Sequence, residues 1–209
     1  MQATMLSATP IQFSNLQNNS GVAPALAAQL FLDVTHDSIN NRADFTFKNG
    51  DGVGDIESVI TRIFFRNTLQ SYFQGSPTLI ETGVEFSQAS YNGAEFGWDS
   101  LVYATDADPA PPKNGITAGG IDSLTVSFLL NSSVTFDDLL DFLTNPTNPT
   151  GASGAAIALH VQSIKPSGDS DKFFNWTPPE TEIPVPEPTS IVLLGIGLIG
   201  LGLMSRMRR

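Results

Sequence analysis

The chain has 209 residues, of which 41% are hydrophobic and 15% are charged, and this balance predicts a folded domain of ordinary size. Its formal net charge is -11 at pH 7, which argues against a nucleic-acid-binding protein because such proteins need a basic face. The absence of cysteine excludes a disulfide framework and a thiolate metal site.

The first part of the chain predicts a loose lead-in followed by short strands. Residues 1–24 are polar and irregular, with one short strand expected around 10–13. Residues 25–176 break into β-like segments separated by Asn, Gly, Asp and Pro. We expect strands at 29–34, 42–48, 59–66, 84–89, 98–104, 123–130 and 156–164. The glycine-rich connection at 48–57 favours a long hairpin loop between the second and third of these strands.

One segment follows the period of a helix instead. Within 135–143, apolar residues recur at i, i+3, i+4 and i+7 from Phe136. Thr135 and Asp138 form the pattern of a capping box at its start, and Pro146 prevents its continuation. We therefore predict an all-β fold, in which 25–176 form an antiparallel β-sandwich ectodomain with one short helix.

The chain offers little that resembles a catalytic or metal site. His36 and His160 lie far apart in sequence and have no partner at metal-ligand spacing, so we interpret both as structural or surface histidines. The G-x-S-x-G, phosphate-binding glycine-loop and H-E-x-x-H motifs are absent from the sequence. We therefore predict no catalytic residue, no cofactor, no metal site, and a protein that is not an enzyme.

A glycine-rich loop carries oxygen-bearing side chains at alternate positions, as a calcium loop does: Asn49, Asp51, Asp55 and Glu57. Counted from Asn49, however, the positions that need oxygen ligands include Val53 and Ile60. A plain loop is therefore the favoured interpretation, and a plain polar turn is favoured for 168–171.

Three aromatic side chains suggest an alternative function. Trp98, Trp176 and Tyr91 would stack on a sugar ring if they were exposed, whereas core or rim positions would give them a packing role. The alternative is therefore a carbohydrate-binding β-sandwich module of the cell surface or matrix, with polysaccharide as its partner.

The C-terminal part differs in composition from the body. Residues 177–185 form a proline-rich spacer that we expect to be extended. Residues 191–204 contain no charged side chain, and as a helix they would span about 21 Å of the ~30 Å hydrocarbon core. We predict a single transmembrane helix that serves as a transient stop. Arg206, Arg208 and Arg209 follow it and favour a cytoplasmic C-terminus before processing.

The order of these parts carries a resemblance. Pro186, Glu187 and Pro188, followed by a short apolar segment and an arginine-rich end, resemble the PEP-CTERM sorting signal of Gram-negative bacteria and cyanobacteria, here at 186–209. The resemblance implies that an exosortase, a membrane enzyme, processes the chain near this motif. It also implies a secreted protein of the cell surface or extracellular matrix, such as that of a biofilm. Phrases such as 45–49 and 122–130 resemble β-rich ectodomains that accompany this signal, which implies no activity.

Proteins with this sorting signal usually begin with a cleavable signal peptide. Residues 1–10 contain neither a basic n-region nor an apolar h-region. We therefore expect the coding sequence to begin upstream of Met1 and to supply the export signal there.

Overall fold

The structure is a computed structural model that describes residues 11–109, 114–144 and 155–175. The chain divides into two units, Met1–Thr177 and Pro178–Arg209, and all the described residues belong to the first. No helix in this described part is long and apolar enough to cross a membrane. The predicted transmembrane helix, the sorting residues 186–188 and the arginine tail lie outside the described residues.

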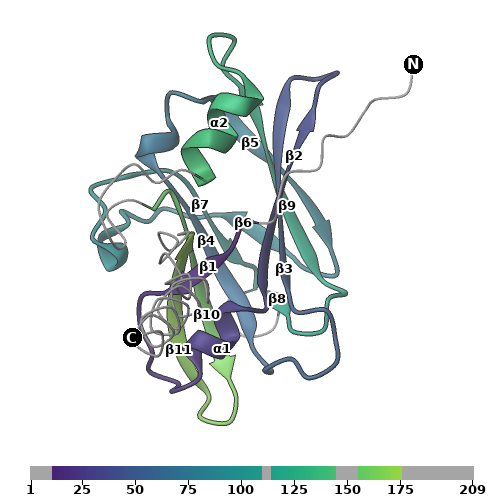
Figure 1. Ribbon diagram of the computed structural model, residues 1–209, viewed down its shortest axis with the longest axis vertical. Coiled ribbons are helices and arrows are strands. Elements are labelled where there is room, and N and C mark those ends of the chain that lie inside the picture. The colour runs from purple at the N-terminus through teal and green to yellow at the C-terminus, as the bar shows by residue number, and fades with distance from the viewer. Residues whose placement is uncertain (1–10, 110–113, 145–154, 176–209) are drawn as a thin grey trace, which may run out of the picture. The chain divides into compact units, whose positions relative to one another are not determined.

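Two antiparallel sheets make up the described part of the chain (Figure 1). The four-stranded sheet contains β2 (Leu30–Asp37), β3 (Arg42–Asn49), β5 (Phe73–Thr82) and β9 (Ser123–Leu130), in the order β2-β3-β9-β5. The seven-stranded sheet contains β1 (Phe13–Asn15), β4 (Val59–Arg66), β6 (Phe86–Gln88), β7 (Leu101–Ala107), β8 (Ile116–Thr117), β10 (Ile157–Ile164) and β11 (Asp169–Asn175). Its order is β1-β11-β10-β4-β7-β6, and β8 pairs with β4.

An aromatic core joins the two sheets. Alternate residues of β3 and β9 point inward, so that Phe45 and Phe128 are at most 1% exposed. The ring centroid of Phe65, on β4 in the other sheet, lies 5.3 Å from that of Phe45 and 5.0 Å from that of Phe128. The described residues therefore form an antiparallel β-sandwich, as the alternation predicts.

Helices are few, and α2 (Phe136–Thr144) begins where the sequence predicts. The Asp138 backbone N–H donates to Thr135 Oγ1 at 3.1 Å, and the Thr135 backbone N–H donates to the Asp138 carboxylate at 2.8 Å. These reciprocal bonds form the predicted capping box. The expectation of a single helix is corrected, because the described part also contains α1 (Ala23–Ala27), η1 (Asn67–Leu69) and η2 (Ala94–Phe96).

The glycine-rich connection after β3 does not close a hairpin, which corrects the expectation from sequence. β3 pairs with β2 and β9, whereas β4 pairs with β7, β8 and β10 in the other sheet. The connection therefore crosses from one sheet to the other. Alternation and turn residues mark strands but do not specify their partners, because strands of both sheets bury apolar residues in the same core.

The segment 11–24 is part of the sandwich rather than a loose lead-in. Phe13 of β1 lies opposite Asn175 of β11, and the Ile11 backbone N–H donates to Leu32 O at 2.9 Å. Ile11 and Phe13 are 5% and 4% exposed. The N-terminal residues therefore close the side of the sandwich where the chain leaves toward its C-terminus.

Candidate functional site

Two of the three aromatic residues considered for sugar stacking, Trp98 and Tyr91, pack on the outer face of the seven-stranded sheet. Trp98 is 3% exposed, and its ring centroid lies 5.2 Å from that of Phe96. Tyr91 is half-buried, and its hydroxyl donates to Asp106 Oδ2 at 2.6 Å. Burial is the main cause that raises the pKa of Tyr91, and the hydrogen bond to Asp106 raises it further. Trp98 thus has no ring face free for a sugar, and Trp176 lies outside the described residues.

His160 lies on the same outer face. It is 9% exposed and sits on β10, opposite Arg62 of β4 and Lys172 of β11. Burial lowers the pKa of His160, because the charged imidazolium loses its water. Glu95 and Asp106 oppose this change, whereas the charges of Arg62 and Lys172 add to it. The surroundings therefore favour a neutral, packed imidazole.

The described residues bring together no group of three or more His, Asp or Glu side chains that could hold a metal ion. His36 lies on β2, in the other sheet from His160, and its ring is stacked on Phe136 with centroids 4.9 Å apart. Each histidine is thus held by packing at a separate place.

Asn49 and Asp55 of the calcium-like loop make hydrogen bonds within the protein. Asn49 is fully buried, and its Oδ1 accepts a hydrogen bond from Gln29 Nε2 at 2.8 Å. Asn49 Nδ2 donates to Ser58 O at 3.0 Å and to Ile116 O at 3.2 Å. Asp55 accepts a backbone N–H within its own loop at 2.8 Å. The Asn49 side chain therefore ties β3 to the segments that enter β4 and β8.

The expectation of a plain polar turn at 168–171 is corrected, because residues 169–171 begin β11 (Asp169–Asn175) and supply a buried carboxylate that holds the N-terminal segment. Asp171 is fully buried, and its Oδ1 accepts a hydrogen bond from the Asn19 backbone N–H at 2.6 Å. Asp171 Oδ2 accepts a hydrogen bond from Ser20 Oγ at 2.5 Å. These bonds hold the link between β1 and α1, so that the helix returns alongside the strand. The sequence pattern gives no sign of this role.

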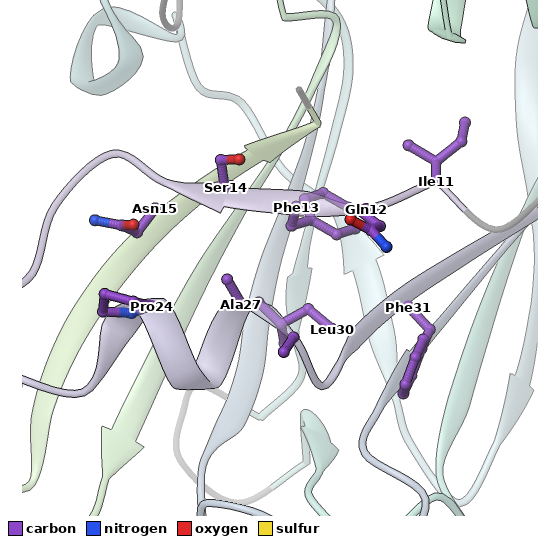
Figure 2. A pocket seen from close by; sticks show the side chains of 10 residues that line it. Ile11, Gln12, Phe13, Ser14, Asn15, Pro24, Ala27, Leu30 and Phe31 are labelled. Atoms are coloured by element: carbon purple, nitrogen blue, oxygen red, sulfur yellow. The ribbon is translucent and has the colours of Figure 1, made fainter. Parts of the chain in front are cut away.

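A groove of 530 Å³ runs between β1 and α1, and we call it the β1–α1 groove (Figure 2). Its volume falls within the roughly 300 to 1,000 Å³ that is usual for ligand sites. One wall is formed by β1 and the residues just before it, and the other by α1 and the start of β2. The lining includes the side chains of Gln12, Phe13, Asn15, Pro24, Leu30 and Phe31.

Both walls of the groove are fixed to the sandwich. The first is held by the pairing of β1 with β11 and by the bond from Ile11 N–H to Leu32 O. The second begins where the Ala23 backbone N–H donates to Asn18 Oδ1 at 3.1 Å. Pro24 in the first turn of α1 has no N–H and therefore leaves no donor unsatisfied at the helix start. The groove is thus bounded by anchored backbone on both sides.

The described residues that line the β1–α1 groove include no charged or titratable side chain. Phe13 and Leu30 form an apolar floor, with 4% and 2% exposure. The amides of Gln12 and Asn15 make no hydrogen bond to another described residue, and the Phe31 ring is half-buried. Such a lining can bind a ligand, but it lacks a general acid or base.

The described residues form a β-sandwich with a lateral groove, and the comparisons add a sorting signal. The family model described as the PEP-CTERM protein-sorting motif matches residues 184–209. The chain therefore carries a PEP-CTERM sorting motif, as Pro186, Glu187 and Pro188 predict. This motif implies processing by an exosortase and export to the cell surface or extracellular space.

No curated protein sequence matches the chain. Among solved structures, the chain is similar to one described as "pH-induced modulation of Streptococcus parasanguinis adhesion by Fap1 fimbriae". The similarity covers 82% of this chain and 94% of the other, with 10% sequence identity and a TM-score of 0.37. A likeness at this level establishes neither a shared fold nor a shared function.

Proposed function

We propose that this protein is an exosortase substrate, retained at the cell surface or in the extracellular matrix, whose β-sandwich acts by binding rather than by catalysis. The match of residues 184–209 to the sorting motif carries the proposal. Pro186 and Pro188 support it physically, because proline fixes φ and lacks an N–H. They favour an extended peptide around Glu187 that a processing enzyme can reach.

The test is the C-terminal mass of the protein after expression with its exosortase. Wild type is expected to lose residues 190–209, whereas Glu187→Ala keeps them. Glu182→Ala is the matched control, because it removes the same charge from the spacer just outside the motif. The proposal fails if wild type keeps residues 190–209, or if Glu187→Ala is processed as completely as Glu182→Ala.

We also propose that residues 191–204 cross the membrane transiently, with Arg206, Arg208 and Arg209 in the cytoplasm. The chain contains no cysteine, so a single Ser205→Cys variant can be labelled specifically. In cells without exosortase, a membrane-impermeant maleimide should label Cys at this position only after the inner membrane is opened. Labelling of intact spheroplasts would contradict the orientation.

Glycan binding by the sandwich is the second candidate function. The observation that favours it is the β1–α1 groove, in which two amides without a hydrogen bond to another described residue and an aromatic ring flank an apolar floor. Retardation of the full chain in a gel that contains polysaccharide is the direct measurement. Unchanged mobility with neutral and with acidic polysaccharides would contradict glycan binding. It would not affect the sorting proposal.

A further inference from the structure

The β1–α1 groove differs in charge from the rest of the molecule. The chain has 21 acidic and 10 basic residues, yet none of either kind is among the described residues that line the groove. Among these residues an anionic ligand would meet no cation, and a cationic ligand would meet no carboxylate. The lining therefore suits an uncharged ligand.

The polar groups in the groove are of a kind that hydroxyl groups satisfy well. A side-chain amide offers donors and an acceptor together, and a sugar hydroxyl does the same. Gln12 and Asn15 both present amides without a hydrogen bond to another described residue. A purely hydrocarbon ligand would cover these amides without satisfying them, which is unfavourable. An uncharged ligand rich in hydroxyl groups fits them better.

The side chains that line the β1–α1 groove are spread along its length (Figure 2). Gln12 and Phe31 lie near one end of the groove, and Asn15 and Pro24 lie at the other. Gln12 and Asn15 are three positions apart, so their Cα atoms are separated by about 10 Å where the chain is extended, and both residues line the groove. A chain-like ligand can therefore contact both amides, while the half-buried Phe31 ring offers an apolar face at one end.

A peptide added as a further strand is the competing occupant. β1 has three residues, and strand addition depends on a row of main-chain hydrogen bonds along an edge. An edge this short provides few of them. The side chains of the groove, rather than its backbone, are thus the main source of recognition.

We propose that the β1–α1 groove binds a neutral polysaccharide, with Phe31 against the apolar face of a sugar and Gln12 and Asn15 bonded to its hydroxyl groups. This inference rests on the proposed function, because it requires a body that binds after export. It places the ligand on a different side of the sandwich from Trp98 and Tyr91, which pack on the outer face of the seven-stranded sheet.

The experiment is affinity electrophoresis of the full chain in detergent. The neutral probes are dextran, a soluble mixed-linkage β-glucan, galactomannan and mannan, and the anionic probe is alginate. At least one neutral probe should retard wild type. Phe31→Leu, which keeps an apolar wall but removes the ring, should weaken binding about tenfold, and Gln12→Ala should act in the same direction.

Gln74→Ala is the matched control, because Gln74 is an exposed amide on β5 in the other sheet. Thermal unfolding midpoints of all variants show whether each retains its fold. If Phe31→Leu does not fold, Gln12→Ala and Asn15→Ala, which change exposed side chains, provide the same test.

Several outcomes would overturn the proposal. These are no retardation by any neutral probe, retardation by alginate alone, or neutral-probe binding that the groove variants do not reduce. Binding that emerges only after removal of residues 1–10 would also overturn it, because the occupant of the groove would then be the chain's own N-terminus. The C-terminal mass measurement is independent of all these results, so the sorting proposal is judged separately.

Discussion

Replacing Asn49 by Asp separates a structural role from a calcium-binding role. The substitution preserves the acceptor that Gln29 Nε2 uses, but it removes the two donors to Ser58 O and Ile116 O. Those two buried hydrogen bonds are worth about 2 kcal/mol together. The new carboxyl must also stay neutral in this fully buried site. At pH 7 that costs about 4 kcal/mol, because its ordinary pKa is near 3.9.

A protonated carboxyl restores one donor, so the expected loss of unfolding free energy for Asn49→Asp is about 5 kcal/mol at pH 7. The thermal midpoint should fall by roughly 10 to 20 °C. Because the folded state raises the pKa of the introduced carboxyl, most of the loss should be recovered as the pH is lowered toward about 4.

The assay is urea or thermal unfolding followed by circular dichroism at several pH values, with and without millimolar Ca²⁺. Asn92→Asp is the control, because Asn92 is exposed and its Oδ1 only accepts a hydrogen bond from the Ala94 backbone N–H. A calcium loop would tolerate aspartate at its first position. The structural reasoning would be refuted by a loss below about 1 kcal/mol at pH 7, or by a Ca²⁺-dependent recovery of the midpoint.

Three further predictions concern the core, the helix cap and pH. Phe128→Ala should cost about 3–5 kcal/mol in urea unfolding, because the Phe128 ring packs within 6 Å of other core rings in both sheets; a cost below about 1 kcal/mol would contradict this core. Thr135→Ala should cost about 1 kcal/mol by removing the side-chain half of the capping box, whereas Thr135→Ser should cost much less; equal losses would argue against the cap. Since burial lowers the pKa of His160, the unfolded chain binds a proton more readily, and stability should fall as the pH drops below about 6.5. His160→Gln should flatten the pH dependence of the thermal midpoint, and an unchanged slope in His160→Gln would contradict this assignment.

Local patterns in the sequence predict some elements closely. β4 and β9 have the predicted bounds, because their apolar residues bury one or both faces of a regular strand. The capping box at Thr135 is local as well. β5 is missed, because Gly75 and Pro77 interrupt its pattern, and the pairing with β9 tolerates them only through a register shift between Gln74 and Thr78.

The candidate site is harder to predict, because distant segments build it. The walls of the β1–α1 groove combine two predicted strand segments, near 10–13 and 29–34, with residues 14–28, and nothing local in the sequence places the two walls side by side. Their link is held by Asp171, which lies on a strand near the other end of the folded domain's sequence. Asn49 shows that residue spacing can also suggest a binding role that the folded structure does not support. Its spacing suggests a ligand, but its partners on other segments make it a structural residue.

The position of β11 affects how the protein withstands pulling. The chain passes from Asn175 at the end of β11 toward the sorting segment, so tension applied there enters the sandwich through this strand. β11 is flanked by β1 on one side and by β10 on the other. Tension along it strains two rows of hydrogen bonds in shear, so they resist together instead of opening one at a time. If the protein is held at the surface through its C-terminal segment, as proposed, this pairing of β11 would help the sandwich to resist unfolding when flowing liquid pulls on it.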